Sequence, residues 1–271
     1  GKSIAFVSKG SLLPTIERVE PEKGHLDEMI KVYGERFGND VEFLKVFFDD
    51  IPSQNYLVTD KRADILLPYN LVKHEFFIRL IYYNGPETKI PYSLATPVVQ
   101  EVIPENPGVG DIIILKGNHF DRKLEKNEVF LGGIRAEIIQ CSREELKVRI
   151  PEDVTSGELD ILVNAQLQSI KQEIKVKLNE PILESFPSEA RVGQELEVKG
   201  KNFNPVFFRN KILINGYEAQ MTEANNTSLK FIMPDVPYPA REAELILEVA
   251  GVSVSANSPI KMMDSWVMLT N

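Results

Sequence analysis

The sequence predicts an all-β protein built from three tandem β-sandwiches, and three observations carry this prediction. A set of landmark residues recurs three times at a constant spacing. Between the landmarks, apolar and polar residues alternate, which is typical of strands with one face in a core and one in water. Glycine and proline fall between these runs, where turns are needed. Several short strands with turn signals in one repeat fit a β-sandwich.

The repeat has an offset of 83 residues, and no gap is needed from its opening proline to its closing proline. A fixed frame of this kind is the sequence signature of a tandem array. Each copy has an opening proline, a Gly-x-x-Phe motif, an apolar triplet and a closing proline. The landmarks are Pro21, Gly34, Phe37, Val46 and Pro68, then Pro104, Gly117, Phe120, Val129 and Pro151, then Pro187, Gly200, Phe203, Ile212 and Pro234.

The Gly-x-x-Phe motif predicts the end of a strand, a turn, and a large aromatic side chain that returns to the core. Burying Phe37, Phe120 or Phe203 would stabilise each sandwich by roughly 1.5–3 kcal/mol relative to exposure. The one helix-like stretch, residues 24–29, is short, and we expect a loop or a single turn there.

The second and third copies carry the residue order of a known family. The third copy reads Pro181, Leu183, Pro187, Gly193, Val198, Gly200, Asn202, Phe203, Ile214, Asn215, Gly216, Ala219, Leu229 and Pro234. The second reads Pro97, Val99, Pro104, Gly110, Gly117, Phe120, Val129, Gly132, Gly133, Ala136, Leu146 and Pro151. Both resemble the IPT/TIG domain. The resemblance covers roughly residues 12–263 and implies three tandem immunoglobulin-like β-sandwiches, and it is specific for fold and not for function.

The first copy diverges from this pattern at its turns. Asp27 stands where the other copies have Gly110 and Gly193, and Asp49 stands where the second copy has Gly132. Because turn glycines often need positive φ, we expect altered turns in this copy.

The frame also divides the chain. We expect an N-terminal lead-in at residues 1–11, the divergent module 1 at 12–95, module 2 at 96–179, module 3 at 180–263 and a C-terminal extension at 264–271. The linkers are short and end in proline, which predicts an extended arrangement. The extension holds Trp266 and is similar to the opening strand of the kelch-like propellers that follow such modules in Bacteroidetes surface proteins, so we expect a further domain there.

Composition excludes several classes of partner. A net charge of −9 and a pI near 5.1 disfavour nucleic acid and anionic membranes, because both are bound through clustered Lys and Arg. No apolar run is long enough to span a membrane. Gly1 and Lys2 look like a tag remnant, so an export signal or a lipid anchor would belong to the uncut precursor.

The sequence offers little material for catalysis, and we expect no enzyme, no cofactor and no metal site. The histidines, His25, His74 and His119, have no metal-ligand spacing and are expected at the surface. Cys141 aligns with apolar residues and is expected to be a small buried hydrophobe. Acidic loop residues such as Asp49 and Asp50 could offer oxygen ligands to calcium, but solvated carboxylates are the more common case.

The repeat itself selects candidate binding residues. An aromatic residue should belong to the core if its repeat position is apolar in all three copies. It should be exposed if the other two copies have polar or charged residues at that position. This criterion, with the tail tryptophan added, selects Tyr33, Phe43, Tyr69, Phe208, Tyr238 and Trp266. Exposed aromatic rings can hold a sugar ring or a partner's apolar patch, and burial between modules is the competing explanation.

Tandem IPT/TIG modules without disulfides resemble those of Bacteroidetes cell-surface proteins, including lipoproteins of glycan-uptake systems. The resemblance implies an exported, non-catalytic protein at the cell surface, or at an outer membrane facing the periplasm. We expect its partner to be a polysaccharide or a surface protein, in a glycan-binding or adhesion-related role. The alternative is an accessory region of a larger carbohydrate-active enzyme.

Overall fold

The computed structural model of the chain describes residues 13–54, 56–82, 85, 87–237 and 241–263. The regular secondary structure of this part is almost entirely β-strand, and its helices are two single turns of 3-10 helix. The predicted fold class, all-β with tandem immunoglobulin-like sandwiches, is thereby confirmed. Residues 24–29 form a bridge and a turn, as expected. Among the described residues, no helix is long and apolar enough to cross a membrane.

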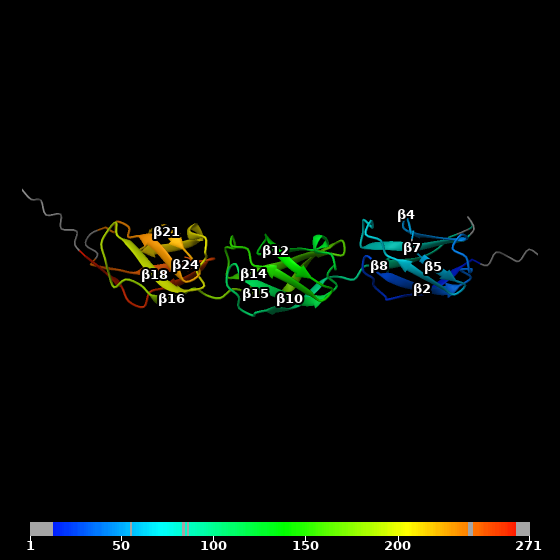
Figure 1. Ribbon diagram of the computed structural model, residues 1–271, viewed down its shortest axis with the longest axis horizontal. Helices are drawn as coiled ribbons and strands as arrows, with labels where there is room; N and C mark the ends of the chain where they lie inside the picture. The colour runs from blue at the N-terminus through cyan, green and yellow to red at the C-terminus, as the bar shows by residue number, and fades with distance from the viewer. Residues whose placement is uncertain (1–12, 55, 83–84, 86, 238–240, 264–271) are drawn as a thin grey trace, which may run out of the picture. The chain divides into compact units, whose positions relative to one another are not determined.

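Module 1 consists of two four-stranded sheets, in the orders β1-β2-β6-β5 and β4-β3-β7-β8. In Figure 1 the sheet with β7 and β8 lies over the sheet with β2 and β5. The side chains between the two sheets form one continuous core. The strands are β1 Thr15–Glu20, β2 Met29–Glu35, β3 Leu44–Phe48, β4 Ile51–Pro52, β5 Tyr56–Thr59, β6 Arg62–Leu66, β7 Glu75–Tyr82 and β8 Glu87–Ser93.

In module 2 the strands form a single seven-stranded sheet, in the order β15-β14-β11-β12-β13-β10-β9. The long strand β12 joins both halves, because it pairs with β11 and with β13. The elements are β9 Val98–Ile103, β10 Ile112–Asn118, η1 Leu124–Lys126, β11 Glu128–Leu131, β12 Ile134–Cys141, β13 Glu145–Arg149, β14 Glu158–Ala165 and β15 Gln168–Lys177.

Module 3 has two four-stranded sheets, β16-β18-β22-β21 and β20-β19-β24-β25, and a small third sheet, β17-β26-β23. The elements are β16 Ile182–Ser185, β17 Glu189–Ala190, β18 Glu195–Lys201, η2 Phe207–Arg209, β19 Asn210–Ile214, β20 Tyr217–Glu218, β21 Gln220–Ala224, β22 Ser228–Ile232, β23 Glu242–Ala243, β24 Leu245–Val249, β25 Val252–Ser255 and β26 Ile260–Met262.

The chain divides into two compact units, residues 1–97 with 164–169, and residues 98–163 with 170–271. The exact boundaries of the three modules and their extended arrangement therefore stay predictions.

The Gly-x-x-Phe motif does what its sequence predicts, and the glycine has a further role. Phe37, Phe120 and Phe203 are buried, and each follows a residue with positive φ that turns the chain. The glycine lies inside its strand, where the neighbouring strand has an irregular register. A side chain at Gly117 would collide with the carbonyl oxygen of Val98. Glycine is thus required by this close backbone approach.

The divergent turns of module 1 keep the geometry of their sisters, which corrects the expectation of altered turns. Asp27 has a φ of 63°, against 80° at Gly110 and 78° at Gly193. Asp49 has a φ of 51°, against 58° at Gly132. Aspartate is one of the residues that adopt this left-handed conformation at tolerable cost, so the substitution is possible.

Candidate functional site

An open groove of about 1090 Å³ lies on the outward face of β7 and β8 in module 1. The face follows from the period of a strand, in which every second side chain points the same way. On β7, Phe77 and Arg79 point outward, while Ile78 is buried in the core. The groove is therefore built on regular strand geometry.

The centre of the groove is apolar. Phe77 is 42% exposed, which is high for a large aromatic side chain. Its cross-strand partner on β8 is Pro91, which is also exposed. Cross-strand partners have neighbouring side chains, so the two rings form a continuous apolar platform. The ammonium group of Lys89 lies over the Phe77 ring at 5.0 Å from its centroid.

The rim of the groove is charged. Its lining includes the carboxylates of Glu22, Asp49, Asp50, Glu75 and Glu87 and the cations of Lys23, Lys73, Arg79 and Lys89. The two signs nearly balance, so the rim offers hydrogen-bond donors and acceptors without a strong net field. An apolar platform with a polar rim is the composition typical of a small-molecule binding surface.

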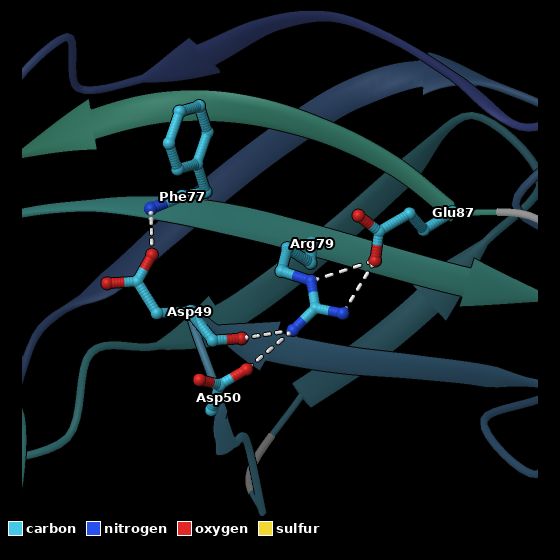
Figure 2. A network of polar contacts seen from close by, with 5 residues as sticks. All are labelled: Asp49, Asp50, Phe77, Arg79 and Glu87. Carbon is cyan, nitrogen blue, oxygen red and sulfur yellow. Dashed lines mark hydrogen bonds and ion pairs between the residues drawn. The ribbon is translucent and has the colours of Figure 1, made fainter.

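Arg79 organises one side of this rim, as Figure 2 shows. Its Nη1 donates to the carbonyl oxygen of Asp49 at 2.7 Å and lies 3.1 Å from Asp50 Oδ1. Its Nε and Nη2 both donate to Glu87 Oε2, at 2.9 and 2.6 Å. The hydrogen bonds to Glu87 are the main cause that raises the pKa of Arg79. The guanidinium also lies over the Phe47 ring, 5.7 Å from its centroid.

The side chain of Asp49 has a separate task. Its Oδ1 accepts a hydrogen bond from the backbone N–H of Phe77 at 2.9 Å, also drawn in Figure 2. Asn215 does the same for Glu244 in module 3, at 2.7 Å. This contact fixes the backbone beneath the platform.

Of the predicted aromatic residues that the structure describes, Tyr33, Phe43, Tyr69 and Phe208, none lines this groove. Phe208 is exposed at 65%, with its ring edge-to-face against Phe207 in η2. Tyr33, on the other sheet, is half-buried under Arg18, 4.0 Å from its ring centroid. Phe43 is half-buried, and Tyr69 is half-buried and packs against the module 1 core. Of these four residues, Phe208 agrees best with the expectation of an exposed aromatic ring. Tyr238 and Trp266 lie outside the described residues.

The sequence criterion missed Phe77 because of a one-residue shift in module 3. At a constant offset, Phe77 faces Asp160 and the apolar Ala243. The backbone shows the true equivalents, because the same strand contact is made by Asp49 N to Phe77 O, by Gly132 N to Asp160 O and by Asn215 N to Glu244 O. Both sisters of Phe77 are therefore acidic. If the repeat is aligned with one inserted residue in the third copy, the criterion selects Phe77.

The criterion was also wrong about Phe207, an aromatic residue whose position is apolar in all three copies. Val41, Leu124 and Phe207 occupy one repeat position, yet they are 45%, 45% and 46% exposed. Leu124 and Phe207 begin the single-turn helices η1 and η2. Strand alternation does not decide which way a side chain points in such turns, so apolar character alone did not predict burial.

Two further expectations need correction. His25 is not a simple surface residue, because its side chain is only 16% exposed and its Nδ1 lies 2.8 Å from Glu28 Oε2. Cys141 is half-buried, not buried, and its Sγ donates to the carbonyl oxygen of Arg122 at 3.3 Å. Burial raises the pKa of this thiol. In the described part of the chain, no group of three or more His, Cys, Asp or Glu side chains is placed to hold a metal ion.

Comparison with known proteins gives a family for the middle of the chain. The profile of the IPT/TIG domain matches residues 97–176, which is less than half of the chain. No curated protein matches. The matched range lies within residues 96–179, the predicted module 2.

The chain is also similar in fold to several solved structures, all at low identity. One is a protein crystallised with a xylogluco-oligosaccharide, with 18% identity, a TM-score of 0.36 and coverage of 92% of this chain and 60% of that one. Another is a surface glycan-binding protein of Prevotella bryantii, with 18% identity, a TM-score of 0.36 and coverage of 61% and 42%. A third is the extracellular region of plexin A4, with 7% identity, a TM-score of 0.34 and coverage of 92% and 34%.

These relatives are longer than the chain, which spans 60% or less of each of the three. Residues 97–176 match the IPT/TIG domain, within a chain of tandem immunoglobulin-like β-sandwiches.

Proposed function

We propose that this chain is a non-catalytic cell-surface protein that binds glycan in the groove of module 1. The observation that carries the proposal is the exposed Phe77 beside Pro91, inside a groove with a charged rim. A sugar ring has an apolar face of C–H groups and an edge of hydroxyl groups. The platform matches the first and the rim matches the second.

An exported protein at the cell surface is the setting in which such a groove would meet polysaccharide. The support for this location is the resemblance to the tandem modules of Bacteroidetes cell-surface proteins, together with the IPT/TIG match at residues 97–176. An outer-membrane position with a lipid anchor in the precursor, and a role in adhesion, are finer proposals of the same kind.

The test is binding of neutral polysaccharides to the whole chain, measured by affinity electrophoresis and calorimetry on xyloglucan and mixed-linkage β-glucan. We expect wild-type protein to bind one of them, and Phe77→Ala to weaken that binding roughly tenfold to a hundredfold, because it removes most of a buried aromatic contact. Phe208→Ala is the matched control, since Phe208 is an exposed ring outside the groove. Equal losses of affinity in both variants, or no binding by wild type, would show that the groove is not the binding site.

The salt dependence of binding and a test for hydrolysis of the bound glycan examine the same proposal further. Ring stacking releases few counterions, so affinity should change little as salt is raised. We also expect no release of reducing sugar from the bound polysaccharide by pure protein. Sustained turnover that survives further purification would show an enzyme in place of a binding protein.

A further inference from the structure

Arg79 connects two parts of the groove that are distant in the sequence. Its guanidinium bonds to the turn between β3 and β4, through Asp49 O and Asp50, and to Glu87 at the start of β8. Five donors in a rigid plane let one side chain reach several acceptors at fixed angles. The arginine therefore fixes the positions of two carboxylates relative to the platform (Figure 2).

Without this arginine, both carboxylates would be free to move. The Asp50 side chain is fully exposed, at 100%, and the Glu87 side chain is 36% exposed. An exposed carboxylate samples several rotamers, and a ligand that uses it must offset the entropy of fixing it. Pre-fixed acceptors avoid that loss.

The fixed carboxylates can still accept hydrogen bonds from a ligand. An ionised carboxylate has about four acceptor positions on two oxygens. Arg79 contacts Oε2 of Glu87 and Oδ1 of Asp50, so the second oxygen of each remains as an acceptor. Hydroxyl groups donate to carboxylates without carrying charge, and glycans are rich in hydroxyls.

The charge of this cluster sets a preference. On this side of the groove the carboxylates of Asp50 and Glu87 pair with the single cation of Arg79, and the Asp49 carboxylate accepts from the Phe77 N–H, so negative charge is in local excess although the whole rim nearly balances. A uronate would bring a further negative charge to this side of the groove, and like charges brought together in an interface suppress binding. A neutral chain meets no such repulsion.

We propose that Arg79 is a positioning residue of the groove, which holds Asp50 and Glu87 as hydrogen-bond acceptors for the hydroxyls of a neutral glycan stacked on Phe77. This inference rests on the proposed function and adds the ligand class and the residue that selects it. Module 2 has Leu162 and module 3 has Ile246 at the equivalent strand position, so the device belongs to module 1.

The competing explanation is that Arg79 is a structural staple for the β3–β4 turn. A staple predicts a loss of stability and no specific effect on ligand recognition. The backbone pairing of β3 with β7 extends along five residue pairs, of which four do not involve Arg79 and the fifth uses only its backbone, so replacement of the side chain should leave the fold intact. The two explanations therefore differ in what a binding experiment measures.

The experiment uses the full chain as wild type, Arg79→Gln, Arg79→Lys, Glu87→Gln and the double variant of Arg79→Gln with Glu87→Gln. The probes are a xyloglucan oligosaccharide, mixed-linkage β-glucan and polygalacturonate, with calorimetry for affinity and urea unfolding for stability. We expect Arg79→Gln to weaken neutral binding about tenfold, the size of one lost charged hydrogen bond. Arg79→Lys should lose part of this, because it keeps the charge but not the fork.

The double variant decides between positioning and stapling. If Arg79 acts through Glu87, the double variant should bind neutral glycan no more weakly than the weaker single variant. The positioning role would be rejected if the affinity losses of the two single variants added in the double variant. It would also be rejected if Arg79→Gln bound like wild type while Phe77→Ala did not. Either result would leave the proposal of glycan binding intact. Wild type that prefers polygalacturonate would reject the neutral class alone. Wild type that binds none of the probes would remove the proposed function and this inference together.

Discussion

The outward faces of module 1 and module 2 occupy equivalent places in the fold and differ in their chemistry. In module 1, β7 presents Phe77, and the ring is left 42% exposed. In module 2, β14 presents Asp160 at the same position, and its carboxylate lies 2.7 Å from Lys171. Lys175 lies 3.6 Å from both Asp160 and Glu158. At this position the module 1 face has an exposed apolar ring, and the module 2 face has a carboxylate paired with two lysines.

This difference separates the side chains that the fold requires from those that can vary. The buried face of each strand must complete the core, as Phe37 and Phe120 do in their modules. The outward face contributes little to stability, so its side chains can differ between copies. The Phe77 ring is not part of the core; it contacts Lys89 and is left 42% exposed beside Pro91, and this is the argument for ligand contact there.

The largest expected effect concerns the part that both modules share. Phe37→Ala and Phe120→Ala should each lower the free energy of unfolding by about 3–5 kcal/mol, because each leaves a cavity in a close-packed core. Urea unfolding followed by fluorescence measures this. A cost below about 1 kcal/mol for either would mean that the two cores are not equivalent.

The next effect comes from exchanging the residue that differs. Phe77→Asp gives module 1 the residue of module 2, and neutral glycan affinity should fall roughly tenfold to a hundredfold with the ring contact. Stability should change by less than about 0.5 kcal/mol, as for other surface substitutions. The reverse change, Asp160→Phe, should create no binding, because the outward side chains of β15 beside it are Lys171, Glu173 and Lys175 and include no apolar partner like Pro91. Binding gained by this variant would mean that one ring is sufficient.

A smaller effect separates two aromatic residues that the sequence criterion treated alike. Tyr69 packs against the module 1 core, whereas Phe208 is 65% exposed. Tyr69→Ala should cost about 1–2 kcal/mol of stability, and Phe208→Ala less than about 0.5 kcal/mol. Thermal and urea unfolding of both variants measure the difference. Equal costs would show that Phe208 is covered in solution.

The sequence predicted the shared architecture well because the constraints on it are local and repeated. The buried Gly-x-x-Phe phenylalanines and the strand alternation need no knowledge of distant contacts. The groove could not be predicted in this way. Arg79, Asp50 and Glu87 meet only because β3, β7 and β8 are neighbours in one sheet, and their spacing in the sequence has no motif. Phe77 carried a usable signal, which the shift of one residue near Glu244 concealed.

The smallest expected effect is a pH dependence that belongs to the module 2 face. The hydrogen bond from Lys171 is the main cause that lowers the pKa of Asp160. Since the carboxylate titrates lower in the folded than in the unfolded chain, its pairing stabilises the fold fully above the unfolded pKa, near 3.9. That contribution is lost as pH falls through the lower folded pKa.

The comparison of Asp160→Asn with wild type, by urea unfolding between pH 2 and pH 7, should therefore give a small constant difference above about pH 5 that vanishes toward pH 2. The effect is small because both partners of the pair are largely exposed, at 47% for Asp160 and 66% for Lys171. Phe77→Ala is the matched control at the equivalent position of module 1. It removes no ionisable group, so its difference from wild type should not change with pH. If the Asp160→Asn difference persisted at pH 2, it would arise from side-chain packing and not from charge, and the module 2 face would not be the self-satisfied ion-pair surface that the comparison requires.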